Sequence, residues 1–425
     1  MRAKRIIACV LLAASACWAF AQQQSPQMAQ FLKEFPQRAG FNTHAYEFIP
    51  IQDTRAPKGY KPFYISHYGR HGARSEWGDF AFKQVVDVLT QAKAEGYELT
   101  SAGDSLLREA TYLRAQYNGM DGRLTPRGVR EHQQLASRMY HRFPTVFKKG
   151  SKQIRAVSST TPRCIVSMNG FTAELRAIQP DLDIDLDTGE KYMAYIAKAA
   201  DRPLKEKVQK VLAERKYNVL PDTVGVYKNL FKDPEAGKKY VKNNFFFHYS
   251  IYAIAKVAEA FDVNDNLFRY LPFDDVYQLH ESTFMNVYLC EGNSALFGAE
   301  RMPMSKDLAD VLISQADAVV SGQSDRAADL TFGHDWPFVG LCCYFGLEGI
   351  SEKLTVEEAA ARWYPSWYCP FAANLQIIFY KAKASDPVLV KFLLNERETA
   401  IPALQPVQGP YYRWEDVKAY VNGRF

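Results

Sequence analysis

Residues 63–74 read Phe-Tyr-Ile-Ser-His-Tyr-Gly-Arg-His-Gly-Ala-Arg, an apolar run typical of a strand followed by a short basic loop. The loop places His71 between the guanidinium groups of Arg70 and Arg74. Two nearby positive charges lower the pKa of an imidazole and keep it neutral, which is its nucleophilic form. Arginines also offer forked donors that match phosphate oxygens, and Gly72 lets an anion approach the backbone closely. The stretch predicts phosphoryl-transfer chemistry, and the alternative is a basic surface loop with a solvated histidine.

Two later segments have the same strand-then-loop pattern. Residues 154–157 form an apolar-ended run that leads into a hydroxyl-rich turn ending at Arg163. Residues 328–332 form another run, which leads into Gly333, His334 and Asp335. In open α/β sheets, ligands bind beyond the carboxyl ends of the strands. We therefore expect these loops to converge on one phosphate although they lie far apart in the sequence.

With these segments the chain resembles the histidine acid phosphatases, the second branch of the histidine phosphatase superfamily. The matching motifs span most of the chain in the family's order: Arg70 to Arg74, Leu124 to Gly128 with Glu131 and His132, Ser159 to Arg163, Gly333 to Asp335, and Phe392 to Glu396. The resemblance implies a phosphohistidine intermediate on His71 and a proton donated by Asp335 to the leaving group. It also implies that Arg70, Arg74, Arg163 and His334 bind the phosphate. This chemistry needs no metal ion, and we expect no cofactor.

Asp335 and His67 each have a second interpretation. Asp335 can protonate a leaving group only if its surroundings raise its pKa enough to keep it protonated, and it can instead cap the helix expected from Trp336. His67 lies only four residues before His71 and competes with it as the nucleophile. Because His67 has no flanking arginines, we assign it a supporting role. Thr125 is expected to cap the next helix, with Pro126 at its first position.

The chain is long enough for one large α/β domain and a smaller inserted one. We expect a three-layer α/β sandwich with a mainly parallel central sheet, formed by residues 22–170 and 325–425. Residues 171–324 are predicted to form a helical insertion, with helices over 205–216, 249–261 and 305–320, the last capped by Ser305. Strands over 375–380 and 388–394 and a helix over 414–421 complete the core. In the resembled family such an insertion covers the active site and selects the substrate.

The first 21 residues are typical of a secretory signal peptide. A positively charged start precedes the apolar segment 6–16, and Ala19-Phe20-Ala21 is a small-residue cleavage site. The segment is short for a membrane span, and Cys17 lacks the surroundings of a usual lipid attachment site. The protein is therefore expected to be exported, periplasmic or secreted. Cleavage leaves 49 basic and 47 acidic residues, a balance that does not favour nucleic-acid binding.

Cysteine and aspartate patterns provide little support for other chemistries. Five cysteines remain after cleavage, an odd number without regular spacing: Cys164, Cys290, Cys342, Cys343 and Cys369. We expect Cys342 and Cys343 to be buried free thiols. Asp181 to Asp187 alternates acids with apolar residues, as in a metal-dependent aspartyl phosphatase, but it lacks that motif's spacer before Thr188. A solvated edge strand or a weak calcium site is the better interpretation.

The resemblance implies that the substrate is a small phosphate ester, with inositol phosphates, sugar phosphates and nucleotides as candidates. The pair His334-Asp335 resembles the acid phosphatase and phytase branch, whereas multiple inositol polyphosphate phosphatases carry His-Ala-Glu there. The surroundings of Tyr368 to Leu375 are closer to the latter. A noncatalytic protein that binds phosphate ligands on this scaffold is a further alternative. The presence of both a nucleophile and a proton donor argues against it.

Overall fold

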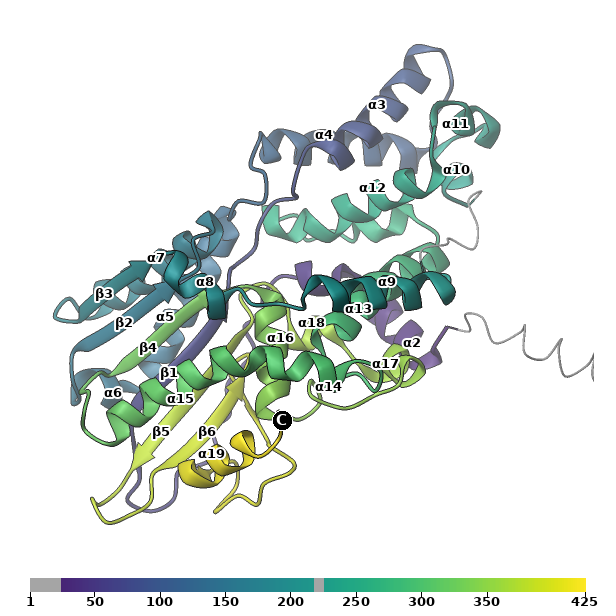
Figure 1. The fold of residues 1–425 in the computed structure, drawn as a ribbon. Helices are drawn as coiled ribbons and strands as arrows, with labels where there is room; N and C mark the ends of the chain where they lie inside the picture. The colour runs from purple at the N-terminus through teal and green to yellow at the C-terminus, as the bar shows by residue number, and fades with distance from the viewer. Residues whose placement is uncertain (1–23, 218–224) are drawn as a thin grey trace, which may run out of the picture.

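The computed structural model describes residues 24–217 and 225–425. The predicted signal peptide, with Cys9 and Cys17, lies outside the described residues. Within them the strands form one sheet in the order β3-β2-β4-β1-β5-β6-β7, with β8 paired to β6 (Figure 1). The strands are β1 (Lys61–Arg70), β2 (Gln153–Ser158), β3 (Asp183–Thr188), β4 (Ala328–Gly333), β5 (Asn374–Lys381), β6 (Leu389–Leu394), β7 (Arg397–Thr399) and β8 (Tyr412–Arg413).

The sheet is mixed rather than mainly parallel. The pairs β3·β2, β2·β4 and β4·β1 are parallel, whereas β1·β5, β5·β6, β6·β7 and β6·β8 are antiparallel. β1, β2 and β4 are each followed by helices, which allow the chain to cross back and start a parallel neighbour. β5 and β6 are joined by a short loop, and a short loop can connect only antiparallel strands. The α/β class is confirmed, with the parallel strands gathered in one half.

Helices cover both faces of this sheet and produce the predicted three layers (Figure 1). Side chains alternate along β1, so that Ile65 packs into one apolar cluster and Tyr64 and Tyr68 into the other. The Ile65 side is covered by α5 (Pro126–Arg142), α6 (Pro144–Lys148) and α7 (Pro162–Ile178). The tyrosine side is covered by α15 (Lys306–Val320), α16 (Asp335–Phe345) and α19 (Trp414–Asn422). Thr125 caps α5 as expected, because its hydroxyl accepts the N–H of Gly128.

The other helices lie in a helical layer beyond the carboxyl ends of the parallel strands (Figure 1), except for residues 190–196, which pack on β4 and α15. They are α2 (Pro26–Glu34), η1 (Pro36–Thr43), α3 (Phe80–Ala94), α4 (Ser101–Tyr117), α8 (Glu190–Ile196), α9 (Arg202–Glu214), α10 (Gly225–Leu230), α11 (Pro234–Tyr240), α12 (Asn244–Val257), η2 (Ala258–Phe261), η3 (Leu267–Tyr270), α13 (Phe273–Glu291), α14 (Gly298–Arg301), η4 (Met302–Ser305), α17 (Val356–Arg362) and α18 (Pro365–Tyr368). No helix in the described ranges is long and apolar enough to cross a membrane.

The limits predicted for the helical insertion, 171–324, do not match this arrangement. α3 packs on α12, and α4 packs on α3 and α10 in the helical layer, although α3 and α4 precede residue 171. In contrast, β3 pairs with β2 in the sheet, and α15 packs on α16 and β1. Helical periodicity shows that a segment buries one face but not which partner covers it, so these assignments needed the structure. Ser305 also differs from expectation, since its hydroxyl accepts a hydrogen bond from Arg301 instead of capping α15.

Candidate active site

Three adjacent parallel strands bring the predicted loops to one place. In the sheet Arg70 at the end of β1 pairs with Gly333 at the end of β4, and Ser158 at the end of β2 pairs with Phe332. The ladder continues into the loops, because the N–H of His71 donates to the carbonyl of Gly333 at 3.0 Å. The loops after β1, β2 and β4 therefore start at the same edge of the sheet. His71, Arg74, Arg163, His334 and Asp335 line one cavity there, of about 640 Å³.

His71 is held as a neutral imidazole with one nitrogen available. Its Nδ1 lies 2.9 Å from the carbonyl oxygen of Gly72, and because a carbonyl can only accept, Nδ1 carries the proton. The unprotonated nitrogen is then Nε2. Burial, followed by the positive charges of Arg70, Arg163 and Arg74, lowers the pKa of His71 well below its ordinary value. The imidazole is thus neutral near physiological pH, which is the form that can act as a nucleophile.

Gly72 and Glu131 hold the catalytic loop in this shape. A Cβ atom on Gly72 would lie 2.4 Å from the carbonyl oxygen of Gly128, so a larger residue would push the loop away from α5. Glu131 of α5 accepts the N–H of Ala73 at 2.7 Å and that of Tyr46 at 3.2 Å. Glu131 therefore supports the loop and does not line the cavity.

Arg74 and Arg163 line the cavity, and all three arginines near His71 keep buried donors without partners among the described residues. The Nε atoms of Arg70, Arg74 and Arg163 are all buried and have no hydrogen-bond partner among the described residues. Arg70 is oriented through Nη1, which donates to the backbone carbonyls of Asn42 and Cys369. Buried donors without partners cost free energy, and a bound oxyanion would satisfy them. The arrangement is suited to binding an anion, which is the role that the sequence predicts for these arginines.

His334 lies beside His71, with 5.8 Å between the ring centroids. Arg163 Nη2 donates to its Nδ1 at 3.3 Å, which places the ring proton on Nε2, near the hydroxyls of Ser159 and Thr161 at 3.2 and 3.3 Å. Burial and the charge of Arg163 lower the pKa of His334 to about 4. The serine and threonine of the hydroxyl-rich turn therefore orient this histidine, a role that the sequence motif did not reveal.

The electrostatic surroundings of Asp335 differ from expectation. Its Oδ2 lies 3.2 Å from Arg70 Nη2, and its Oδ1 accepts the N–H of Trp336 at 3.0 Å. Burial alone would raise the pKa of Asp335, but the positive charge of Arg70, with His334 and Arg74, lowers it below the ordinary value. Asp335 also stands at the first position of α16, where His334 is the cap residue. The raised pKa that a proton donor needs is thus not present in these surroundings, because the cations next to His71 act on the acid as well.

His67 is placed away from this chemistry. It is buried within β1, its ring packs against Phe171 and Phe332, and it does not line the cavity. Burial, with a smaller contribution from His132, lowers the pKa of His67 to about 3. Packing between apolar rings agrees with the supporting role predicted from the sequence.

A segment that no motif indicated, residues 41–47, reaches the site from η1. The backbone carbonyl of Asn42 accepts from Arg70, and its side-chain Nδ2 donates to Asp335 Oδ2 at 2.5 Å. Phe41 has a φ of 57°, which is unusual for a bulky residue and is tolerated where surrounding contacts impose it. Sequence reasoning missed Asn42 because a single asparagine in a short helical segment has no pattern.

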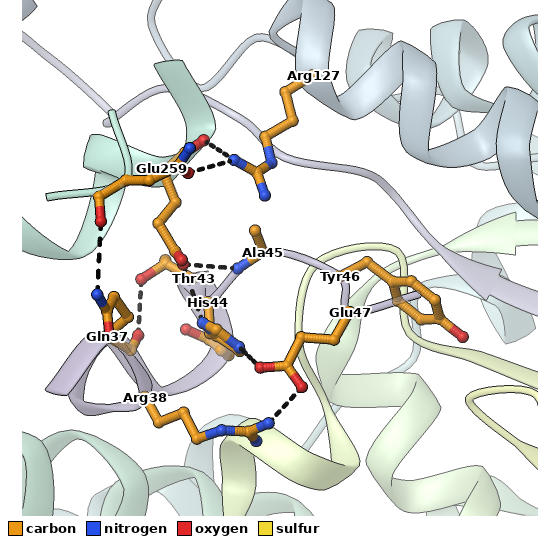
Figure 2. Close-up of polar contacts among 12 residues, drawn as sticks. Gln37, Arg38, Thr43, His44, Ala45, Tyr46, Glu47, Arg127 and Glu259 are labelled. Atoms are coloured by element: carbon orange, nitrogen blue, oxygen red, sulfur yellow. Dashed lines mark hydrogen bonds and ion pairs between the residues drawn. The ribbon is translucent and has the colours of Figure 1, made fainter. Parts of the chain in front are cut away.

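An ion-pair cluster fixes this segment between the two layers (Figure 2). His44 Nδ1 lies 2.9 Å from Glu259 of η2, and its Nε2 lies 2.8 Å from Glu47, which also pairs with Arg38. Burial alone would lower the pKa of His44, but the hydrogen bonds to Glu259 and Glu47 raise it above its ordinary value. Arg127 Nη1 donates to the backbone carbonyl of Glu259 at 2.9 Å. The segment carrying Asn42 is thereby tied to the helical layer.

The structure also shows the environment of the cysteines and of the acidic strand β3. Cys164, Cys290, Cys342, Cys343 and Cys369 are all buried free thiols. β3 is an edge strand with Ile184 buried and its acids largely exposed, and it is remote from the cavity lining. Among the described residues no group of histidine, cysteine, aspartate and glutamate side chains is placed to hold a metal ion.

No family model and no curated protein matches this sequence. Solved structures do match its fold. The multiple inositol polyphosphate phosphatase of Bifidobacterium longum in complex with phosphate aligns with a TM-score of 0.72 at 16% identity, over 91% of this chain and 98% of that one. The phytase from D. castellii aligns with a TM-score of 0.57 at 13% identity, over 91% and 85% of the chains. The phytase of Citrobacter braakii aligns with a TM-score of 0.54 at 11% identity, over 85% and 97%. The chain therefore has the fold of the histidine acid phosphatases, as its motifs predict.

Proposed function

We propose that this protein is an exported phosphomonoesterase that works through a phosphohistidine on His71. The observation that carries the proposal is the cavity in which a neutral imidazole, with Nε2 unprotonated, lies with Arg74 and Arg163. Arg70 is buried close to it, and the Nε atoms of all three arginines lack partners among the described residues. The similarity in fold to phytases and an inositol polyphosphate phosphatase supports it. Export is inferred from the signal-peptide pattern of residues 1–21 alone.

In the first step His71 Nε2 attacks phosphorus while the bond to the ester oxygen breaks. The three guanidiniums of Arg70, Arg74 and Arg163 stabilise the equatorial oxygens as charge spreads over them. Asp335, protonated once the phosphate has offset the positive charge around it, gives its proton to the departing oxygen. In the second step the Asp335 carboxylate takes a proton from water, whose oxygen displaces Nε2 and releases phosphate. The histidine and the carboxylic acid are restored.

Release of phosphate from p-nitrophenyl phosphate tests the proposal. We expect wild-type turnover, and less than a few per cent of it in His71→Ala with the fold intact by circular dichroism. Trapping with labelled substrate is expected to place phosphate on an imidazole. Label on an aspartate or serine would contradict the mechanism. Turnover is also expected to survive EDTA and to be inhibited by vanadate, which mimics the trigonal-bipyramidal transition state.

Two alternatives remain distinct proposals. Specific hydrolysis of inositol polyphosphates is favoured by the similarity in fold to a multiple inositol polyphosphate phosphatase, whose structure was solved in complex with inositol hexasulfate. A noncatalytic phosphate-binding protein would bind phosphate esters without turning them over. The p-nitrophenyl phosphate assay separates that alternative from an enzyme.

A further inference from the structure

The cavity has two ends of different chemistry. Arg74, Arg163 and His334 surround His71 at one end, whereas helices α9, α12 and α13 form the other with amides, hydroxyls and aromatic rings. We propose that the substrate is the phosphate monoester of an uncharged, polyhydroxylated ring, such as a sugar or cyclitol, and not a molecule with several phosphates. This inference rests on the proposed phosphatase activity and concerns the leaving group.

The polar wall opposite the phosphate end is uncharged. Gln209 of α9 and Asn286 of α13 meet there, and Gln209 Nε2 donates to Asn286 Oδ1 at 3.0 Å. The remaining ends of these two amides are a donor, Asn286 Nδ2, and an acceptor, Gln209 Oε1. Ser282 and Thr283 add hydroxyl groups to the same wall. Sugar hydroxyls both donate and accept, so they match such a wall, whereas a phosphate would meet no positive charge on it.

An aromatic surface adjoins the phosphate end. The ring of Trp77 covers the guanidiniums of both Arg74 and Arg163, at 4.2 and 4.7 Å from the ring centroid, yet it is 59% exposed. Phe245 and Tyr249 of α12 also line the cavity. A flat apolar surface next to a few polar groups is typical of a site that orients a small ligand. A sugar ring can place its C–H face on these rings and its hydroxyl edge toward the amides.

Positive charge beyond the phosphate end is scarce in the described cavity. Lys256 lines it, but its Nζ lies 3.7 Å from Glu76 Oε1, which offsets its charge. Lys205 lies at the edge, with Nζ 5.1 Å from the ring centroid of Trp336. Each phosphate of a polyphosphate brings about −1.5 to −2 charges at neutral pH, and burying them without cations is costly. One phosphate satisfies the cationic end, and no second cluster of cations lines the described walls.

The test compares substrates and changes the wall at one exposed position. We expect wild-type kcat/KM for glucose 6-phosphate and myo-inositol 1-phosphate to exceed that for inositol hexakisphosphate by at least about tenfold. Gln209→Lys adds the missing cation and is expected to raise kcat/KM for the hexakisphosphate about tenfold, the size of one charge-assisted contact. Gln209→Met, of similar length and without charge, is the matched control and should give no such gain. Gln323→Lys, exposed before β4, controls for net charge.

The outcomes separate this inference from the proposed function. If p-nitrophenyl phosphate is hydrolysed but wild type prefers the hexakisphosphate, or if Gln209→Met gains as much as Gln209→Lys, the inference is wrong and the activity stands. If p-nitrophenyl phosphate is not hydrolysed, the proposed function fails. In that case calorimetry measures the affinity of the wild-type protein for glucose 6-phosphate and for the hexakisphosphate, and the two affinities are compared. Tighter binding of the hexakisphosphate would overturn it, and tighter binding of the sugar phosphate would support it.

Discussion

Asn42 Nδ2 lies 2.5 Å from Oδ2 of Asp335, so an amide from the N-terminal segment contacts the proposed proton donor directly. The same oxygen lies 3.2 Å from Arg70 Nη2. Both contacts favour the ionised carboxylate, since an amide N–H and a guanidinium can only donate. The acid is thus oriented for its task but deprotonated in the unliganded site, and binding of a phosphate must change that balance.

The first prediction concerns the pH dependence of turnover. The pKa of Asp335 is lowered in the free protein, chiefly by Arg70 against the effect of burial, so its protonated form is lost as pH rises through that lowered value. A bound phosphate dianion offsets the charges of Arg70 and Arg74 and is expected to raise this pKa. Because kcat/KM reports the free enzyme and kcat the complex, the falling limb of kcat should lie at higher pH than that of kcat/KM. The pH profiles of kcat and kcat/KM on an alkyl phosphate check this prediction. Falling limbs at the same pH for both constants would contradict it.

Asp335→Asn should separate leaving groups by their need for a proton. The variant keeps the side chain's size and leaves His71 intact, so alkyl and inositol phosphates should slow by roughly 100- to 10,000-fold. Aryl phosphates should suffer less, because nitrophenolate leaves without protonation. Single-turnover measurements of the first step provide the comparison. An equal loss on both kinds of ester would remove Asp335 from the role of general acid.

Asn42→Ala should impair proton donation by Asp335 and leave the nucleophile His71 unchanged. Loss of a hydrogen bond to a charged group costs about 1.5–3 kcal/mol, which allows roughly a tenfold or greater fall in kcat on alkyl phosphates and a smaller one on aryl phosphates. The falling pH limb of kcat/KM should also move upward, since the lost donor stabilised the carboxylate. Asn169→Ala, on the exposed side of α7, is the control for asparagine loss. An unchanged pH limb would leave Asn42 with a purely structural role.

His44 should make the fold more sensitive to alkaline than to mildly acidic conditions. Its pKa is raised by Glu259 and Glu47, so its stabilising charge is fully present below the ordinary histidine pKa and is lost as pH rises through the raised value. His44→Gln should lower the free energy of unfolding by about 3 kcal/mol at pH 5 and by less above pH 8. Urea unfolding at both pH values measures this. His141→Gln, exposed on α5, is the matched control. If His44→Gln lowered the free energy of unfolding equally at both pH values, the charged interaction of His44 with Glu259 and Glu47 would be disproved.

Several elements could be predicted because their signals are local. Arg70 to Arg74 after an apolar run, the Thr125-Pro126 start of α5, and the turn after β4 each combine a strand or helix pattern with its boundary residues. The helices α9, α12 and α15 were recognised from their apolar periodicity. The mixed character of the sheet was not predicted. Strand pairing depends on which segments the folded chain brings together and on the length of the connections between them.

The sequence by itself determined which residues gather around His71, since its two flanking arginines, Arg163, His334 and Asp335 all lie at or after the ends of recognisable strands. Only the tertiary structure decided the rest of the cavity. Asn42, Gln209 and Asn286 come from separate helices with no shared motif, and their contacts arise when the helical layer packs over the strand ends. The protonation of Asp335 was likewise decided there, because a pKa depends on the distances to surrounding charges, which spacing in the chain does not contain.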